Sequence, residues 1–596
     1  MISRRELLTA ASPLALAGCR NESRYFGNTQ PPGRQHLICA TIDTGGSLDP
    51  ARSADFVGEG SILRALFEGL TTYHPQTLEP MAGIATHYET SLDGLRITLY
   101  LRGHSRPRGA ALPNTNNLRS ELRSGTLTVD LSGLPDPPPD RVPVYWSDGA
   151  AVTAHDVVYS WRRAIDRDTA APYGYLLYSI QNAREVNAGG MSPDKLGVRA
   201  LDDFTLQVDL RAPTSFFLGS LSCPPFFPVS RRAIESAKSG GREERWTEPD
   251  AIVTSGAFTL RERRARDRIV LARNPHYIEA GLIGLDQVSF LFIPEFAVGA
   301  NLYKSGRAHF TSGLALPPMV VPALRGKRDL RTARAFGTFF PCFNTKKPPF
   351  DNVLVRYAFN MATDKRAITD VFGFGRTPAR TLVPPMARYR APDSLRVQID
   401  DKTYDVLDYD PAGAQALLAK AGYPGGLDSQ GRRLRIHLLC GSFADARLHC
   451  EILQQQWQAT LGVEVPIETQ EFGALIQNIF SGNYEGITIW NDWGFYLDPN
   501  WFLDQFVTGS SVNPSGWSDP KYDYLLAEAN ATTDAALRMQ RLAECELYLL
   551  RAMPFFPEYF DVWAYPQKPY LRGIQPNAMD VHPFKYAWID TNWRPS

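Results

Sequence analysis

Apolar residues recur along this chain with two spacings, and each spacing predicts one kind of element. Residues 61–70 place Ile62, Leu66 and Leu70 on one helical face, which predicts an α-helix. Residues 95–101 alternate apolar with polar side chains, which predicts a strand. Further strands are predicted at residues 36–41, 204–210, 269–272, 288–293, 434–439 and 463–469. Strands interspersed with helices predict mixed sheets with helices packed on them, and therefore an α/β fold.

Helix starts can be read from capping residues. Thr153 and Asp156 have the spacing of a capping box, with Asp in place of Glu, so a helix should begin at Thr153. Asp410 followed by Pro411 predicts another helix start, and Gly422 predicts the end of that helix.

Two segments depart from this regular pattern. Residues 103–144 are rich in Pro, Asn, Arg and Ser, which predicts a poorly ordered insertion with one hairpin near residues 126–131. Residues 490–501 are dense in aromatic side chains, and Gly494, Asp498 and Pro499 favour a loop as far as Pro499. An aromatic loop suits a water-poor ligand cleft, although core packing accounts for part of this content.

The N-terminal residues 1–19 have the pattern of an export signal. A basic start at Arg4 and Arg5 precedes a short apolar run that ends in Leu-Ala-Gly-Cys19. This ending resembles a bacterial lipobox, which predicts lipidation of Cys19, and Ser-Arg-Arg-x-Leu-Leu resembles a twin-arginine signal. The alternative is an ordinary cleaved signal with a chance cysteine. Residues 20–35 are polar and Pro-containing, as expected of a tether.

Composition narrows the classes of protein further. The chain has 596 residues with 63 basic and 63 acidic side chains, which suits two or three domains and disfavours nucleic acid as a partner. No second segment has the pattern of a transmembrane helix, so we expect any membrane attachment to be through the lipid. Six cysteines remain beyond Cys19, either as buried free thiols or as up to three disulfides, with Cys440 and Cys450 the nearest pair.

Catalytic signatures are absent from the sequence. The chain has no H-E-x-x-H, G-x-S-x-G or Walker A motif, and its ten histidines lack metal-ligand spacing. Two Ser-x-x-Lys matches, at Ser192 and Ser518, contain Pro and Asp and therefore predict turns. We expect no enzyme activity, no cofactor and no metal site.

Several motifs together resemble one family. Residues 146–163 read WSDGAAVTAHDVVYSWRR, and further matching motifs lie at residues 47–50, 67–70, 166–178, 196–203, 246–249, 254–258, 273–277 and 350–356. Their order resembles the periplasmic oligopeptide- and dipeptide-binding proteins, which are extracellular solute-binding proteins (family 5) of ABC peptide importers. The resemblance covers nearly all of the chain beyond residue 36 and leaves residues 103–144 as an addition.

The resemblance implies a two-lobed, three-domain periplasmic solute-binding fold of the α/β class, with mixed sheets and a hinge. Domain I would be discontinuous, and the implied segments are the signal at 1–19, the tether at 20–35, domain I at 36–69, 213–340 and 557–596, domain II at 70–212, and domain III at 341–556.

The resemblance also implies where a ligand lies between the lobes. The matching positions are Val57, Gly58, Glu59, Tyr173, Tyr175, Phe472, Asn491, Asp492, Trp493, Gly494, Phe495 and Tyr496. One departure concerns the family motif W-x-x-D-Y-x-[DE]-P, whose Asp pairs with the ligand amine, because Phe495 occupies that position here. Asn478 and Ile489 stand near the places of two family arginines, and Asp498 matches an acid that begins a helix.

These observations predict an exported lipoprotein that captures a peptide or peptide-like ligand and delivers it to an inner-membrane ABC permease and ATPase. We expect a monomer in the periplasm. Since Phe495 carries no charge, Asp492 or Glu59 is the candidate to face a ligand amine. The alternatives are an exported enzyme, and a peptide receptor or chaperone that takes no part in transport.

Overall fold

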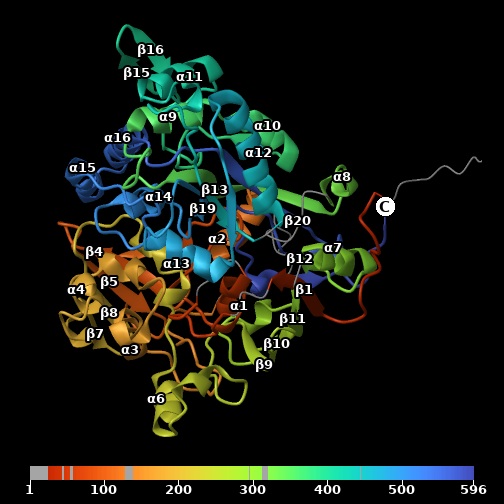
Figure 1. The fold of residues 1–596 in the computed structure, drawn as a ribbon. Helices are drawn as coiled ribbons and strands as arrows, with labels where there is room; N and C mark the ends of the chain where they lie inside the picture. Colours follow the sequence, from red (N-terminus) through yellow and green to blue (C-terminus); the bar gives the residue numbers. More distant parts are fainter. Residues whose placement is uncertain are drawn as a thin grey trace, which may run out of the picture.

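The computed structural model describes residues 24–42, 46–53, 58–127, 138–293, 296–311, 320–442 and 444–595. The predictions for the signal segment with Cys19, for Val57 and for most of the hairpin near residues 126–131 lie outside these residues. Within them, the chain forms three large sheets surrounded by helices (Figure 1).

The first sheet joins distant parts of the chain in the order β12-β1-β11-β10-β9. Its strands are β1 (His36–Ile42), β9 (Phe258–Arg264), β10 (Arg268–Arg273), β11 (Gln287–Ile293) and β12 (Phe310–Thr311). β1 pairs in parallel with β11 and β12, while β10 is antiparallel to both of its neighbours. The sheet is therefore mixed, and the N-terminal strand lies between strands that follow more than 200 residues later.

The second sheet is antiparallel and has the order β6-β4-β5-β8-β7. Its strands are β4 (Ala85–Thr90), β5 (Arg96–Leu101), β6 (Ala110–Ala111), β7 (Val198–Asp202) and β8 (Thr205–Asp209). Residues 103–127 hold β6 and helix α2 (Thr115–Ser124), so the expectation of poor order is wrong for this part of the insertion. Asn114 forms a capping box at the start of α2, and Leu118 is buried against Met81 and Tyr586.

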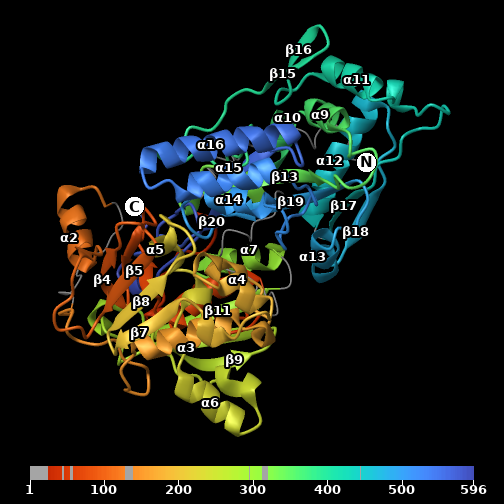
Figure 2. The same cartoon turned by 90° about the vertical axis from the view of Figure 1, so that its left-hand side faces the viewer.

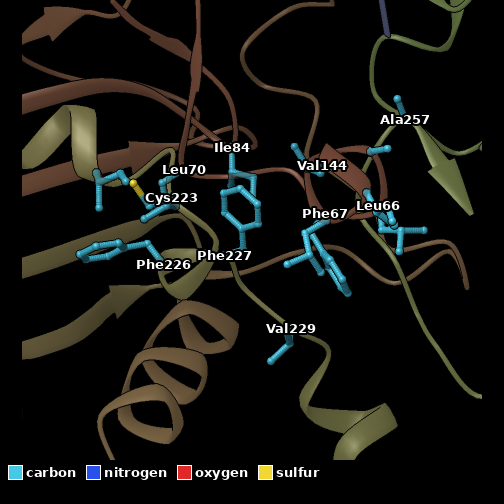
Figure 3. Packing of buried hydrophobic residues seen from close by; sticks show 14 of the residues in the cluster. Leu66, Phe67, Leu70, Ile84, Val144, Cys223, Phe226, Phe227, Val229 and Ala257 are labelled. Atoms are coloured by element: carbon cyan, nitrogen blue, oxygen red, sulfur yellow. The ribbon is translucent and has the colours of Figure 1, made fainter. Parts of the chain in front are cut away.

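One hydrophobic core underlies these two sheets. Figure 3 shows Phe67, Ile84, Cys223 and Phe227, which come from three separate segments, meeting in it. Burial of each large apolar side chain contributes about 1.5 to 3 kcal/mol, so this core fixes the segments relative to one another. We call this part of the molecule, with the first two sheets, the first lobe.

The third sheet has the order β14-β20-β13-β19-β17-β18. Its strands are β13 (Leu330–Phe343), β14 (Thr377–Pro378), β17 (Leu438–Gly441), β18 (Ile467–Gln470), β19 (Ile487–Trp493) and β20 (Tyr559–Pro566). A second hydrophobic core surrounds it, and we call this part the second lobe (Figure 2). Its helices are α9 (Val353–Met361), α10 (Lys365–Phe372), α11 (Pro411–Lys420), α12 (Ala444–Leu461), α13 (Phe472–Phe480), α14 (Asn500–Leu503), α15 (Pro520–Ala531) and α16 (Ala535–Ala552).

Short elements connect and cover the sheets. The helices are α1 (Gly58–Leu66), α3 (Ala154–Ile165), α4 (Ala183–Asn187), α5 (Phe217–Ser220), α6 (Arg231–Ser239), α7 (Phe296–Ser305) and α8 (Val321–Leu324). The remaining strands are β2 (Thr71–Tyr73), β3 (Pro80–Ala82), β15 (Arg396–Ile399), β16 (Lys402–Asp405), β21 (Leu571–Arg572) and β22 (Trp588–Ile589).

β13 and β20 run from one lobe into the other. They pair antiparallel over most of their length, with a break in register between Arg334 and Thr338. Beyond β20, Gln567 forms an isolated bridge with Phe310 of β12, so the end of β20 meets the edge of the first sheet.

The capping predictions are confirmed. Thr153 and Asp156 form both halves of the capping box of α3, and the Asp410 side chain accepts the Gly413 N–H at 2.9 Å at the start of α11. The helix predicted at residues 61–70 ends earlier, at Leu66, because Gly69 and Leu70 accept hydrogen bonds from Ile84 and Ala85 in an extended arrangement. The six described cysteines are free and buried.

Candidate ligand-binding site

The aromatic segment at residues 490–493 is a strand rather than the predicted loop. β19 includes Trp490 to Trp493 and pairs antiparallel with β13 throughout, because Asn491 lies opposite Phe339 and Trp493 opposite Gly337. The loop begins only at Gly494, whose N–H donates to the Phe336 carbonyl at 2.8 Å. Glycine and proline signals after Trp493 thus mark where the strand ends.

The other edge of β19 is unpaired beyond its first residues. β17 pairs with β19 only at Ile487 and Thr488, and no strand among the described residues lies beside the rest of that edge. The Phe339 carbonyl accepts a hydrogen bond from Glu558 on the β20 side, so the Phe339–Asn491 pair is not hydrogen-bonded. The main-chain groups of Asn491 and Trp493 therefore point away from β13, toward the unpaired edge.

Aromatic side chains from both lobes meet beside this strand. Tyr173 of the first lobe has its ring centroid 5.9 Å from that of Tyr175 and 5.7 Å from that of Phe495. Trp501 of α14 lies 4.6 Å from Phe495 and 5.5 Å from Tyr496, measured between ring centroids. We call these five residues the aromatic box.

The two lobes also touch through polar contacts at the same loop. The Tyr73 hydroxyl donates to the Phe495 carbonyl at 2.7 Å, and the Cys223 thiol approaches the same oxygen at 3.3 Å. Phe216 stacks on Tyr496 with 4.8 Å between ring centroids and an interplanar angle of 4°. These contacts hold the loop after β19 against the first lobe.

Asp492 is a half-buried carboxylate next to the aromatic box. It accepts a hydrogen bond from the Gln505 side-chain amide at 2.9 Å. Burial raises its pKa to about 7, and the side chains of Trp501 and Gln505 and a backbone N–H offset only part of that effect. Nearby Asp504, on the 3-10 helix Asp504–Phe506, also has a pKa raised by burial.

Tyr175 belongs to the first lobe. Burial raises the pKa of its hydroxyl far above the usual value, and the fields of Tyr173, Asp492, Tyr496 and Asp504 raise it further. Sequence reasoning missed three residues of this site, namely Gln505, Asp504 and Tyr73. The sequence did hold a signal for Asp504 and Gln505, because these two polar residues directly follow the aromatic run.

Asp498 has a structural position beneath this site. Its side chain accepts the Asn500 N–H at 2.9 Å, as expected of an acid that begins a helix. It also forms a buried bidentate pair with Arg538 of α16, at N–O distances of 2.7 and 2.9 Å. The pair fixes the loop against α16 and leaves no charge on Asp498 for a ligand.

The remaining predicted residues lie in several places. Gly58 begins α1, and buried Glu59 accepts a hydrogen bond from the Ser53 hydroxyl at 2.9 Å. Phe472 begins α13. Trp493 lies on the face of the sheet opposite Asp492, where its ring centroid is 5.2 Å from that of Trp563. Asn478 and Ile489 stand near the positions where the family has two arginines. The Asn478 side chain donates to the Gln470 side chain, and Ile489 lies in β19.

The described residues also bear on metal binding and membrane insertion. No group of three or more His, Cys, Asp or Glu side chains is arranged to hold a metal ion within the described ranges. In that part of the chain, no helix combines the length and apolar character needed to cross a membrane.

Two lobes joined by two strands, with an unpaired strand edge and an aromatic box between them, define a protein that binds a ligand between its lobes. Residues 141–514 match the family described as "Bacterial extracellular solute-binding proteins, family 5 Middle". The chain belongs to this family, whose members bind solutes rather than catalyse reactions.

Named relatives share most of the chain. The periplasmic murein peptide-binding protein MppA of Escherichia coli is 28% identical over 552 residues, which is 91% of each chain. The periplasmic oligopeptide-binding protein OppA of E. coli is 31% identical, over 77% of this chain and 85% of OppA. The "Probable deoxycholate-binding periplasmic protein YgiS" of E. coli is 31% identical, over 73% of this chain and 78% of YgiS.

Solved structures share the fold. The E. coli murein tripeptide binding protein MppA superposes with a TM-score of 0.77 at 28% identity, over 94% of this chain and 99% of that one. Haemophilus influenzae OppA in complex with the peptide RPPGFSPFR gives 0.74 at 25% identity, over 94% of this chain and 100% of that one. The unliganded open form of MppA gives 0.67 at 28% identity, over 94% and 98%.

Proposed function

We propose that this protein captures peptides between its two lobes in the periplasm and delivers them to an ABC importer in the inner membrane. The observation that carries the proposal is the unpaired edge of β19, whose main-chain groups at Asn491 and Trp493 face the gap beside the aromatic box. A peptide backbone can add to such an edge as a further strand, so binding depends little on side-chain identity.

The relatives support this choice of ligand. MppA and OppA carry murein peptide and oligopeptide in their names, and both match this chain over most of its length. YgiS is named for deoxycholate, which is an anion. The half-buried carboxylates Asp492 and Asp504 disfavour an anion at the aromatic box, because like charges repel strongly where water is scarce. Deoxycholate therefore serves as the control ligand.

The proposal includes a hinge between the lobes. β13 and β20 are the strands that would bend, near the register break between Arg334 and Thr338. The interlobe contacts of Tyr73 and Phe216 describe a closed arrangement, and the lower TM-score against the open form of MppA agrees with it. Domain I at 36–69, 213–340 and 557–596, domain II at 70–212 and domain III at 341–556 would then move as two lobes.

Attachment to the membrane through Cys19 belongs to the same proposal. The Leu-Ala-Gly-Cys19 ending supports a lipid anchor, with export by the twin-arginine route. In a bacterial host, a Cys19→Ala variant should stay unprocessed or become soluble. Processed variant protein that still sediments with membranes would rule out the anchor.

Calorimetry combined with small-angle scattering tests peptide capture. Titration with trialanine should show binding, and the radius of gyration should fall or stay at its compact value at saturation, whereas deoxycholate should not bind. Binding of deoxycholate without any peptide would overturn the proposal. Consumption of the peptide during the titration would favour an exported enzyme. Loss of the protein in its native host should abolish peptide uptake, and intact uptake would favour a receptor outside transport.

A further inference from the structure

We propose that a basic surface beside the N-terminal segment docks on anionic phospholipid headgroups, as a second attachment to the membrane besides the lipid on Cys19. We call this surface the basic face, and its residues are Arg24, Lys304, Arg307, Arg325, Lys327 and Arg328. The inference rests on the proposed lipid anchor, because the anchor brings this face to the membrane. Its test uses protein without the lipid, so the two proposals can fail separately.

The predicted tether at residues 20–35 is packed on the folded protein from Arg24 onward. The Phe26 N–H donates to both oxygens of the Asp329 carboxylate, at 2.9 and 3.0 Å. The Phe26 ring stacks on Tyr303 of α7 with 6.3 Å between ring centroids, and the Tyr303 hydroxyl donates to the same carboxylate at 2.8 Å. These contacts tie the N-terminal segment to one face of the first lobe.

This docking limits how far the face can lie from a lipid on Cys19. Cys19 is five positions before Arg24 in the sequence. A chain spans at most about 3.6 Å per residue, so Arg24 lies within about 18 Å of Cys19 even if the chain between them is fully extended. A lipid on Cys19 would therefore hold this face of the first lobe next to the headgroups.

Basic residues lie on both sides of the docked segment. The Arg24 carbonyl accepts the Arg328 N–H at 2.8 Å, and the Asn28 N–H donates to the Lys304 carbonyl at 2.9 Å. Residues 24–28 therefore lie between α7 and the chain that follows α8, two helices that lie at the right-hand side of Figure 1. The side chains of Arg24, Arg328 and Lys304 are exposed.

The charge around this segment is almost entirely of one sign. Residues 296–334 contain seven Lys or Arg and a single acid, Asp329, whereas the whole chain balances 63 basic with 63 acidic residues. The Asp329 carboxylate is buried beneath the N-terminal segment. Arg307 and Arg325 are exposed, and neither forms an ion pair within 4 Å with another described residue. Such a surface attracts anionic lipid, with roughly a fivefold gain in affinity for each basic residue near the headgroups.

Aromatic side chains at the edge of the basic face favour a membrane over a soluble anion. Tyr25 and Trp593 are half-buried, and their rings meet edge to face with 5.6 Å between centroids. Exposed Arg594 follows Trp593. Amphipathic rings beside basic side chains are typical of protein surfaces at headgroup level, where one end of the ring is apolar and the other wet.

Vesicle sedimentation tests the basic face without the lipid. The protein is the mature chain from residue 20, which contains every residue that the structure describes and lacks Cys19. At about 0.05 M salt it should bind vesicles of phosphatidylglycerol and phosphatidylcholine at least about 100-fold more tightly than vesicles of phosphatidylcholine alone. At about 0.5 M salt this preference should be largely lost, because salt screens exposed charges.

Charge removal locates the binding surface. The triple variant Lys304→Gln, Arg307→Gln, Arg325→Gln should bind the anionic vesicles about 30-fold or more weakly, and Arg325→Gln alone about fivefold more weakly. The matched control removes the same charge from three exposed arginines of the second lobe, as Arg366→Gln, Arg390→Gln, Arg396→Gln. The control should bind vesicles like the parent, and both triple variants should bind trialanine like the parent.

Each outcome decides the inference. A salt-sensitive preference for anionic vesicles that only the variants of the basic face lose supports it. Equal binding of the parent to both kinds of vesicle overturns it, even if a triple variant fails to fold, and a loss of peptide uptake in the host would then assign the face to the permease. Equal losses in the two triple variants also overturn it, because net charge alone would then explain binding. Fractionation of Cys19→Ala tests the lipid anchor separately.

Discussion

Asp492 can carry a negative charge beside the aromatic box, whereas Phe495 is uncharged. Phe495 contributes only a ring to the aromatic box, whereas Asp492 contributes a carboxylate whose pKa burial raises to about 7. In the folded protein without ligand, this acid therefore binds its proton more tightly than the ordinary value of 3.8 implies. Its burial costs stability wherever it must be ionised.

The sign of this effect gives a prediction for stability. Between pH 4 and 7 the folded state binds more protons than the unfolded state at Asp492, so the free energy of unfolding falls as the pH rises through this range. At pH 8, Asp492→Asn should raise that free energy by roughly 1 to 3 kcal/mol, after allowance for partial exposure, and at pH 4 it should change little. Urea unfolding at both pH values measures this. A variant that is less stable than the parent at pH 8 would contradict the account.

A buried pair beneath the box makes a contrasting prediction. Asp498 and Arg538 satisfy each other at 2.7 and 2.9 Å, so removing one partner leaves an unpaired buried charge. Arg538→Met should lower the free energy of unfolding by about 3 to 5 kcal/mol. Adding Asp498→Asn to that variant should recover part of the loss, and purely additive losses in this double-mutant cycle would show that the two side chains are not coupled.

Among the elements, sequence pattern predicted the helices with clear caps and the strands with clear alternation. Thr153 and Asp410 begin α3 and α11 because their caps are local, and local signals can be read from sequence. β19 was missed because Trp490 to Trp493 lie next to a glycine and a proline, and only pairing with distant β13 makes them a strand. The same holds for Tyr73 and Cys223, whose contacts with Phe495 join residues more than 250 positions apart.

The unpaired edge of β19 is testable as an element. The N–H of Asn491 points away from β13, so Asn491→Pro should remove a donor to the ligand without breaking the ladder to β13. Trialanine affinity should fall by about 30-fold or more, from the loss of the donor and from the collision of the proline ring with the added strand. The melting temperature should change by only a few degrees. Unchanged affinity in a folded variant would mean that the ligand backbone does not use this edge.

In the whole molecule, the contacts between the lobes set how readily the cleft opens. Tyr73 donates across the gap to the Phe495 carbonyl at 2.7 Å. Tyr73→Phe removes about 1 kcal/mol of hydrogen bonding, so it should shift the balance toward the open form about fivefold and weaken ligand binding by a similar factor.

Small-angle scattering without ligand measures this shift as a larger mean radius of gyration. Tyr159→Phe is the control, because the Tyr159 hydroxyl bonds Glu235 within the first lobe at 2.9 Å. If both variants scatter like the parent, then the Tyr73 contact does not hold the lobes together.

Native mass spectrometry of the protein purified from its own host without unfolding tests the central claim most directly. The account predicts a bound population of peptides with varied sequences, released on denaturation and identified by fragmentation, because an unpaired strand edge binds the peptide backbone whatever its side chains. Release of one uniform molecule that contains no peptide bond, such as a bile acid, would contradict it.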